Sequence, residues 1–324
     1  MSDDTEHSIP AALMPRQEQV DYDLEAALSA VVSVRASIPE DAYTAQILGT
    51  ERAGHGVVIS AEGLVLTIGY LITEAEQLWL FDQTGRAVAG DVVAYDYETG
   101  FGLIQALGKL GVAPLELGSV QALAVDDPVI IAGYGGRKQA LRAKVAAIGE
   151  FAGYWEYLIE KALFTAPPHP NWGGAAVLDP AGRLCAIGSL YIDRILPHGT
   201  AVEGNMSVPV DLFKPIMTEL LSFGRTLKPP RPWLGMFVSQ VRDALVVAGV
   251  YAHAPAASAL RSGDVVRAVA GSPVTALAEF LRQIWACGEA GVDIPLTIER
   301  ERRILELRVR SVDRRSFWKK PSLH

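Results

Sequence analysis

Short apolar runs separated by turn residues dominate the first two thirds of the chain. In residues 56–68, GVVISAEGLVLTI, side chains alternate between the two faces of a predicted strand on either side of a Glu62-Gly63 turn. Residues 77–96 repeat this pattern around a loop at 82–86. Alternation with a period of two is typical of half-buried strands. Turn signals recur about every 8–12 residues, so the pattern predicts a β-sandwich or a β-barrel over residues 31–189.

Two helices are expected to flank this region. Residues 24–31 carry apolar side chains at helical spacing behind a capping residue, Asp23. In residues 211–223 an apolar stripe begins at a capping Asp211, a proline lies in the first turn, and Gly224 is placed to end the helix.

A proline-rich stretch, TLKPPRP, is the strongest candidate for a domain boundary. After it the sequence predicts strands, one helix near residues 276–286 and a terminal hairpin. The expected organisation is a mobile segment at 1–22, a β domain at 23–225, a linker at 226–232, a smaller α+β domain at 233–313 and a basic tail at 314–324.

Composition excludes several classes of function. The net charge of −8 gives no support to nucleic-acid binding. Neither a metal nor a cofactor is expected, because no residues have metal-ligand spacing and no glycine-rich loop resembles a phosphate site. Cys185 and Cys287 are expected to be buried free thiols. The acidic start lacks the features of a signal peptide and no apolar run reaches the length of a membrane span, so we expect a cytoplasmic protein, or a periplasmic one if a leader was removed.

Several motifs together resemble those of one protease family. GHGVVISAEGLVLT, LTIGYLI, GFGLIQA and NWGGAAVLDPAGRLCAIG occur in the order of the HtrA/DegP catalytic-domain motifs, and WLGM and SALRSGDVV resemble PDZ elements. The resemblance covers residues 24–312. It implies a mostly β protein, with a trypsin-like double β-barrel followed by an α+β PDZ domain.

Carried over residue by residue, the resemblance implies a degenerate catalytic triad. Tyr70 stands at the histidine position, Gly100 at the aspartate position and Trp172 at the serine position. A phenol with a pKa of about 10 is a poor base at neutral pH, and an indole has no nucleophilic atom. Pro170, at the oxyanion-hole glycine, has no N–H. No catalytic residue is therefore expected.

Other roles for this region stay open. His169 and Tyr70 could form an acid–base pair beside Asn171, although a loop histidine among packed aromatic residues is the simpler interpretation. His55, between two glycines, is interpreted as a turn residue. The sequence leaves open whether Trp172 fills a pocket or gates one.

The PDZ resemblance implies a peptide-binding groove that needs no catalysis. A PDZ domain binds a terminal carboxylate through backbone N–H groups and adds the peptide as a strand to a sheet edge. The alternative is an occluded groove used only for packing. The expected peptide-binding residues are Trp233, Leu234, Gly235, Met236, Phe237, Val238, Phe280 and Ile284.

The sequence thus predicts a catalytically inactive HtrA-like protein that binds protein C-termini or unfolded segments as an adaptor, scaffold or chaperone in protein quality control. One alternative is an active serine endopeptidase of the family, and another is an inactive subunit that regulates an active relative. The resemblance also implies a homo-trimer formed through the N-terminal segment. The expected partners are peptides, without nucleic acid or a membrane span.

Overall fold

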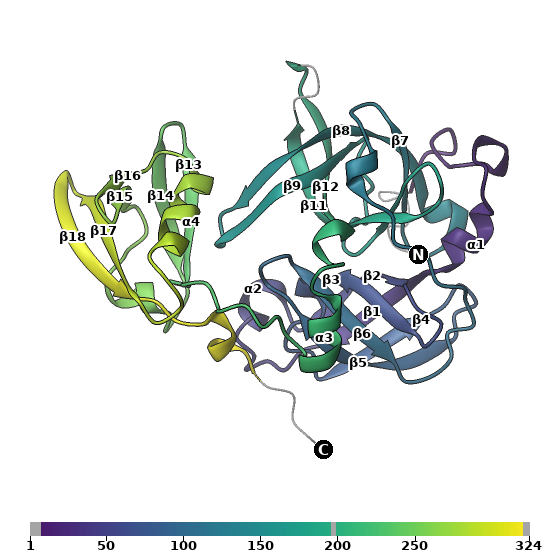
Figure 1. The fold of residues 1–324 in the computed structure, drawn as a ribbon, viewed down its shortest axis with the longest axis horizontal. Coiled ribbons are helices and arrows are strands. Elements are labelled where there is room, and N and C mark those ends of the chain that lie inside the picture. Colours follow the sequence, from purple (N-terminus) through teal and green to yellow (C-terminus); the bar gives the residue numbers. More distant parts are fainter. Residues whose placement is uncertain (1–7, 196–198, 320–324) are drawn as a thin grey trace, which may run out of the picture. The chain divides into compact units, whose positions relative to one another are not determined.

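The computed structural model describes residues 8–195 and 199–319, which form two compact units (Figure 1). The first unit combines the chain up to Gly149 with Lys161–Thr226 and the residues from Lys319 onward. The second combines Glu150–Glu160 with Leu227–Trp318.

The first unit contains two closed β-barrels, as expected from the alternating pattern. The first barrel has the strand order β1-β2-β3-β6-β5-β4 and the second has β10-β11-β12-β9-β8-β7. Neighbouring strands are antiparallel, and the turns at 59–63 and 82–86 lie where the sequence predicts them. The strands are β1 Val31–Ser37, β2 Glu51–Val58, β3 Leu64–Ile68, β4 Gln77–Phe81, β5 Ala87–Tyr95, β6 Phe101–Ala106, β7 Pro128–Ala132, β8 Ala140–Gly153, β9 Tyr157–Ala166, β10 Ala176–Leu178, β11 Leu184–Ile195 and β12 Val202–Pro209.

Both helices expected beside the barrels are present, one with a changed start. The Asp23 carboxylate caps α1 by accepting from the N–H of Ala26 at 3.0 Å. Helix α3 begins only at Met217, after the proline, because Asp211 binds Ser119 and Val120 instead of capping it. The helices of this unit are α1 Leu24–Ser29, α2 Ala45–Leu48 and α3 Met217–Phe223, with 3₁₀ turns η1 Gln17–Gln19, η2 Gly69–Leu71, η3 Val120–Ala122, η4 Gly136–Gln139 and η6 Val210–Leu212.

The N-terminal segment needs a correction. Ile9 is buried with the apolar core of the second barrel, and Leu13 and Met14 pack against the same cluster. The backbone N–H of Arg142 donates to the carbonyl of Leu13. The expectation of a mobile segment at 1–22 therefore does not describe residues 9–14, because Ile9 is buried and Leu13 and Met14 are half-buried against this core. Residues 1–7 lie outside the described residues.

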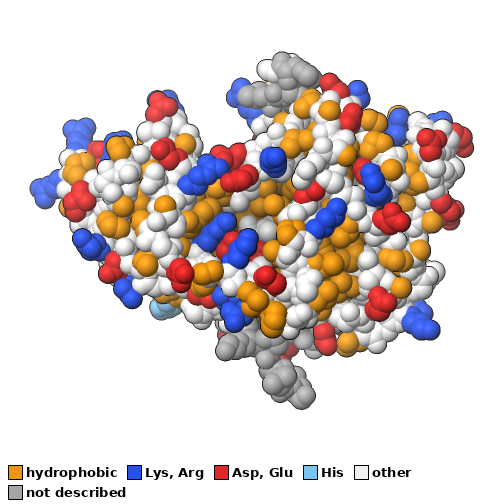
Figure 2. All heavy atoms as spheres, in the orientation of Figure 1, with side chains coloured by type: hydrophobic (Ala, Val, Ile, Leu, Met, Phe, Trp, Pro, Cys, Tyr) orange, Lys and Arg blue, Asp and Glu red, His pale blue; other side chains and the backbone are white. Residues whose placement is uncertain are grey.

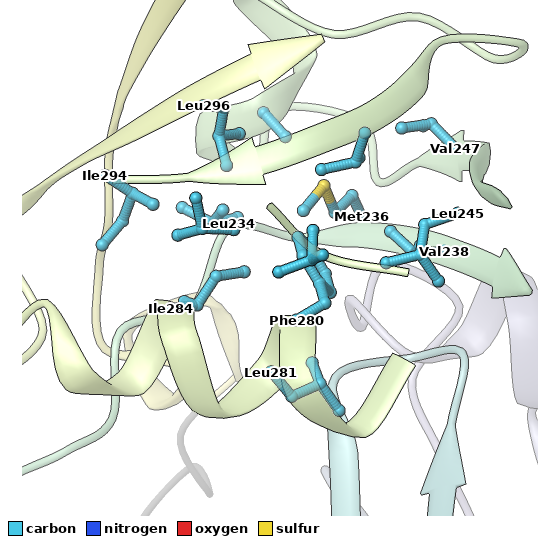
Figure 3. Packing of buried hydrophobic residues seen from close by; sticks show 14 of the residues in the cluster. Leu234, Met236, Val238, Leu245, Val247, Phe280, Leu281, Ile284, Ile294 and Leu296 are labelled. Carbon is cyan, nitrogen blue, oxygen red and sulfur yellow. The ribbon is translucent and has the colours of Figure 1, made fainter. Parts of the chain in front are cut away.

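The second unit is a sheet covered by one helix. The sheet has the order β13-β14-β15-β17-β18, with β16 paired to β15, so β13 is an edge strand. Two side chains of α4 point towards the sheet, as Figure 3 shows for Phe280 and Ile284, and Leu281 belongs to the same buried cluster. The elements are β13 Met236–Val241, β14 Ala244–Val250, η7 Pro255–Ser258, β15 Val265–Val269, β16 Ser272–Pro273, α4 Leu277–Ala286, β17 Asp293–Arg300, β18 Arg303–Arg310 and η8 Arg314–Phe317.

The boundaries of the second unit differ from the sequence expectation. The first unit ends at Thr226, where the predicted linker begins. Within that stretch, the carbonyl of Pro230 accepts from the N–H of Ala290. In the basic tail, the ring of Phe317 lies 5.2 Å from that of Trp233. The linker and residues 314–318 therefore pack as part of this unit. Residues 150–160, the tip of the β8–β9 hairpin, also belong to it, which the sequence does not predict.

The thiols agree only in part with the compositional expectation, because Cys185 is buried whereas Cys287 is half-buried. On the face shown in Figure 2, basic and acidic side chains are interspersed. Both thiols are free. Within the described residues, none of the helices has the length and apolar character needed to cross a membrane.

Candidate functional site

The resemblance implies that Tyr70, Gly100 and Trp172 stand at the histidine, aspartate and serine positions of the triad. The hydroxyl of Tyr70 forms a hydrogen bond with backbone. Tyr70 lies on η2, directly after β3, and its hydroxyl donates to the carbonyl of Ser189 on β11 at 2.9 Å. Burial raises the pKa of the Tyr70 phenol well above its usual value. The phenol is therefore neutral at physiological pH and acts as a hydrogen-bond donor, not as a base.

Gly100, at the aspartate position, contributes only backbone to this region. Its carbonyl accepts from the N–H of Gly69 at 2.7 Å, and its own N–H donates to the carbonyl of Asp96 at 2.7 Å. Its φ of +86° is a left-handed conformation that favours glycine. The turn thus holds the backbone beside Tyr70 while offering no group that could orient a base.

Trp172, at the serine position, lies half-buried in the loop between β9 and β10. Its ring lies 5.7 Å from the ring of Tyr191, and its carbonyl accepts from the N–H of Ala175 at 3.0 Å. The indole can donate one hydrogen bond but cannot attack a carbonyl. Pro170, two positions earlier, has no N–H to offer an oxyanion.

His169 is fully buried, and both of its ring nitrogens have backbone partners. Nδ1 accepts from the N–H of Asn171 at 3.0 Å, which leaves Nε2 to donate to the carbonyl of Gln139 at 3.1 Å. The amide side chain of Asn205 accepts from the N–H of His169 at 2.6 Å. The Tyr70 hydroxyl binds Ser189 and both His169 nitrogens bind backbone, so the alternative of a His169–Tyr70 pair is not formed and the simpler interpretation of a loop histidine holds. These hydrogen bonds stabilise the loop and leave neither histidine nitrogen free for acid–base work.

His55 corrects another expectation, because it lies inside strand β2 and not in a turn. Its Nδ1 accepts from the N–H of Tyr134 at 3.0 Å, and its Nε2 donates to the carbonyl of Asn171 at 3.1 Å. Burial, together with nearby His169, lowers the pKa of His55 to about 4. The neutral ring therefore joins β2 to the loop that holds Trp172.

The Gly173-Gly174 pair has a structural role that does not involve catalysis. The carbonyl of Gly173 accepts from the N–H of His55 at 2.9 Å. A Cβ atom on Gly174 would lie 1.9 Å from the His55 carbonyl oxygen, and φ at Gly174 is +79°. Packing against β2 therefore requires glycine here, whatever residue stands at position 172.

The second candidate site is the loop that precedes β13. The N–H groups of Leu234, Gly235 and Met236 point to one place, where they bind the carboxylate of Glu156 at 3.1, 2.7 and 3.1 Å. Gly235 has a φ of +76°, and a Cβ there would lie 2.2 Å from that of Ala254. The loop thus forms the backbone nest for a carboxylate that the WLGM motif predicts.

The other predicted groove residues lie around this nest. Trp233 is buried and packs against Tyr251 and Phe317. The structure buries Met236, Val238, Phe280 and Ile284 in one apolar cluster, and half-buries Phe237, whose ring lies 4.4 Å from that of Tyr251. Glu156 was missed by sequence reasoning, because nothing in its local sequence distinguishes it from a surface glutamate.

The described residues 8–195 and 199–319 contain no group of three or more His, Cys, Asp or Glu side chains that could hold a metal ion.

Comparison with known proteins identifies both domains. Residues 54–187 match the trypsin-like peptidase domain, and residues 232–310 match the PDZ domain. A probable periplasmic serine endoprotease DegP-like of Pseudomonas fluorescens is 25% identical over 276 residues, or 80% of this chain and 56% of that protein. The serine protease PepD of Mycobacterium tuberculosis is 27% identical over 293 residues, or 82% of this chain and 60% of that protein. The chain thus spans less than two thirds of either relative.

A solved structure shows the same fold. The HtrA-type protease AlgW with decapeptide has a TM-score of 0.52 and 20% identity, with 93% of this chain and 100% of that chain covered. This chain is therefore related to the HtrA/DegP proteases and has a trypsin-like domain followed by a PDZ domain, as expected. The cytoplasmic expectation receives no support, since the name of the Pseudomonas relative places that protein in the periplasm.

Proposed function

We propose that this relative of the HtrA/DegP proteases binds peptides and protein C-termini without cleaving them. The observation that supports the absence of cleavage is the set of residues at the triad positions. Tyr70 is a neutral hydrogen-bond donor, Gly100 has no side chain and Trp172 has no nucleophile. Removing the nucleophile or the base of a serine protease costs on the order of 10⁶ in kcat.

The oxyanion position supports the same proposal. In this fold a backbone N–H two residues before the nucleophile helps to stabilise the oxyanion, and Pro170 has none. Loss of one such donor costs about 10²–10³ in kcat. His55 and His169 offer no replacement base, because both ring nitrogens of each histidine are already hydrogen-bonded to backbone groups.

Support for peptide binding comes from the second unit. The amides of Leu234, Gly235 and Met236 converge on a carboxylate, and β13 is an edge strand beside them. These are the parts with which a PDZ domain binds a C-terminus. A bound client would be held and not cut, which fits an adaptor, a scaffold or a chaperone.

The alternative function is that of an active serine endopeptidase. It is favoured by the names of the relatives, which are serine proteases. On that alternative the nucleophile would come from a residue outside the aligned triad. A non-cleaving subunit that assembles with an active relative is compatible with the same site.

A fluorophosphonate probe together with a casein cleavage assay tests the proposal. The wild-type chain is expected to show no labelled serine and no cleavage above the level of a heat-denatured sample. A Trp172→Ala variant provides the matched control, since it opens the space at position 172 without adding a nucleophile. Labelling of a serine with turnover in the wild type would establish the endopeptidase alternative and overturn the proposal.

A further inference from the structure

The carboxylate nest of the PDZ domain is occupied by a side chain of the same chain. Glu156, at the tip of the β8–β9 hairpin, accepts hydrogen bonds from the backbone amides of Leu234, Gly235 and Met236. These partners are 78, 79 and 80 positions away in the sequence. A glutamate side chain presents the same two oxygens and the same charge as a chain terminus.

The backbone next to Glu156 also follows the pattern of a bound peptide. The N–H of Val238, on edge strand β13, donates to the carbonyl of Tyr154 at 2.9 Å. Tyr154 is two residues before Glu156, whose carboxylate accepts the amide hydrogen bonds, and its ring lies 5.9 Å from that of Phe237. The tip thus begins the strand addition by which PDZ domains bind extended segments.

An apolar side chain completes the resemblance to a ligand. Leu158 is buried in the same cluster as Leu234, Phe280 and Ile284, on the sheet and on α4. Arg314 reaches the tip as well, because its guanidinium donates to the carbonyl of Trp155 at 3.4 Å. The hairpin therefore supplies a carboxylate, a backbone carbonyl and an apolar group to one site.

The choice of glutamate at this position points to a role for its carboxylate. Glu156 has a φ of +62°, a conformation that favours glycine or asparagine and strains a longer side chain. Only 8% of its surface is exposed, and burying a carboxylate is costly unless it is paired and hydrogen-bonded. Burial raises the pKa of Glu156, whereas the amides and the Arg314 charge oppose that shift.

We propose that residues 150–160 are a built-in ligand of the PDZ groove, which an external C-terminus must displace in order to bind. The proposal rests on the peptide-binding function proposed above and deepens it, because it states that residues 150–160 fill the groove when no external peptide is bound. A competing internal segment reduces the apparent affinity for a peptide by the fraction of molecules whose groove is open.

Two variants separate the effect of the Glu156 carboxylate from the effect of the backbone conformation of the hairpin. Glu156→Gln keeps the length and the backbone conformation but removes the charge. Glu156→Gly removes the side chain and relaxes the positive φ, so the hairpin can still fold. Glu160→Gln is the matched control, because Glu160 is an exposed glutamate on the same hairpin.

The first measurement is hydrogen exchange of the Leu234, Gly235 and Met236 amides in the full chain, by NMR without any peptide. These amides are expected to exchange about tenfold faster in Glu156→Gly than in the wild type, and Glu156→Gln should fall between them. Glu160→Gln should match the wild type. Equal exchange in the wild type and Glu156→Gly would overturn the proposal.

The second measurement is fluorescence anisotropy with a labelled free-acid peptide that ends in Tyr-Trp-Leu. Glu156→Gly is expected to bind this peptide about tenfold more tightly than the wild type and Glu160→Gln. Equal, measurable affinity in all variants would show that the tip does not compete, and would also overturn the proposal. If the amides respond to Glu156→Gly but no variant binds the peptide, the internal ligand stands and the proposed peptide-binding function fails.

Discussion

The backbone N–H of His55 lies 2.9 Å from the carbonyl oxygen of Gly173, to which it donates a hydrogen bond. This bond joins strand β2 to the loop in which a serine protease holds its nucleophile. A side chain on the next residue, Gly174, would collide with the carbonyl of His55 at 1.9 Å. The glycine pair therefore stays under structural constraint even when position 172 holds a tryptophan.

Replacing Gly174 by alanine is expected to destabilise the first unit by about 3 kcal/mol or more, because the clash involves backbone and φ is +79°. The control is Gly111→Ala, which has a φ of +70° but nothing within 4 Å of the added Cβ. That variant should lose only about 1 kcal/mol. Urea denaturation measures the free energy of unfolding of both variants. Equal losses of stability would show that the contact with the His55 carbonyl does not add to the cost of the substitution.

Trp172→Ser alone is expected to leave casein uncut and the fluorophosphonate probe unreacted. At the histidine position that the resemblance implies, Tyr70 donates its hydroxyl to the carbonyl of Ser189, so no base there would accept the proton of a serine at position 172. The measurement is probe labelling of the single variant beside the wild type. Turnover in the single variant would mean that a base and an oxyanion donor lie elsewhere in the unit.

Full repair is expected to require Tyr70→His, Gly100→Asp and Pro170→Gly in addition to Trp172→Ser. One of these changes carries a cost that the sequence does not reveal. Gly100 has a φ of +86°, so an aspartate there is strained by about 1 kcal/mol. Gly100→Asp alone should therefore lower the urea midpoint of the first unit, and an unchanged midpoint would contradict this backbone conformation.

Acid is expected to destabilise the first unit between about pH 6.5 and pH 4 through His55. The folded pKa of about 4 lies below the ordinary 6.5, so the unfolded chain binds the proton first and stability falls as pH decreases through this window. The loss is about 3 kcal/mol for His55, and His169, whose pKa is also lowered by burial, adds to it. Urea titrations at several pH values measure the slope.

The control for this titration is His253→Gln, because His253 is an exposed histidine. It should leave the slope between pH 6.5 and pH 4 unchanged. The raised pKa of Glu156 acts with the opposite sign on the second unit, so the first unit must be followed separately. A flat stability profile for the first unit in this window would show that His55 is not held neutral.

Peptides with a free, apolar C-terminus are expected to bind the second domain with Kd on the order of micromolar, about −8 kcal/mol. Amidation should abolish binding, since the nest of Leu234, Gly235 and Met236 amides recognises a carboxylate. Calorimetry with free-acid and amidated forms of one peptide, on the Glu156→Gly chain, is the measurement. Equal binding of both forms would mean that the nest does not bind the terminus.

Local patterns were sufficient for most of the fold. Alternation around Glu62-Gly63, the cap at Asp23 and the apolar stripe of α4 involve neighbours in sequence, so a single chain reveals them. The same local reasoning failed at His55. Its flanking glycines suggest a turn, yet they are required because a Cβ on Gly54 or Gly56 would lie 2.5 or 2.6 Å from packed side chains.

The sequence by itself predicted the trypsin-like and PDZ domains. Through the resemblance it also implied a degenerate triad and a carboxylate-binding loop, because these inferences depend on residue type at a recognisable position. Only the tertiary structure decided which groups bind the histidines and which carboxylate fills that loop. The ring of His55 is fixed by a hydrogen bond from the N–H of Tyr134, 79 positions away, and the nest is filled by Glu156, 79 positions from Gly235. Hydrogen bonds over such separations leave no periodicity in the sequence, because burial and direction decide them only after the strands have packed.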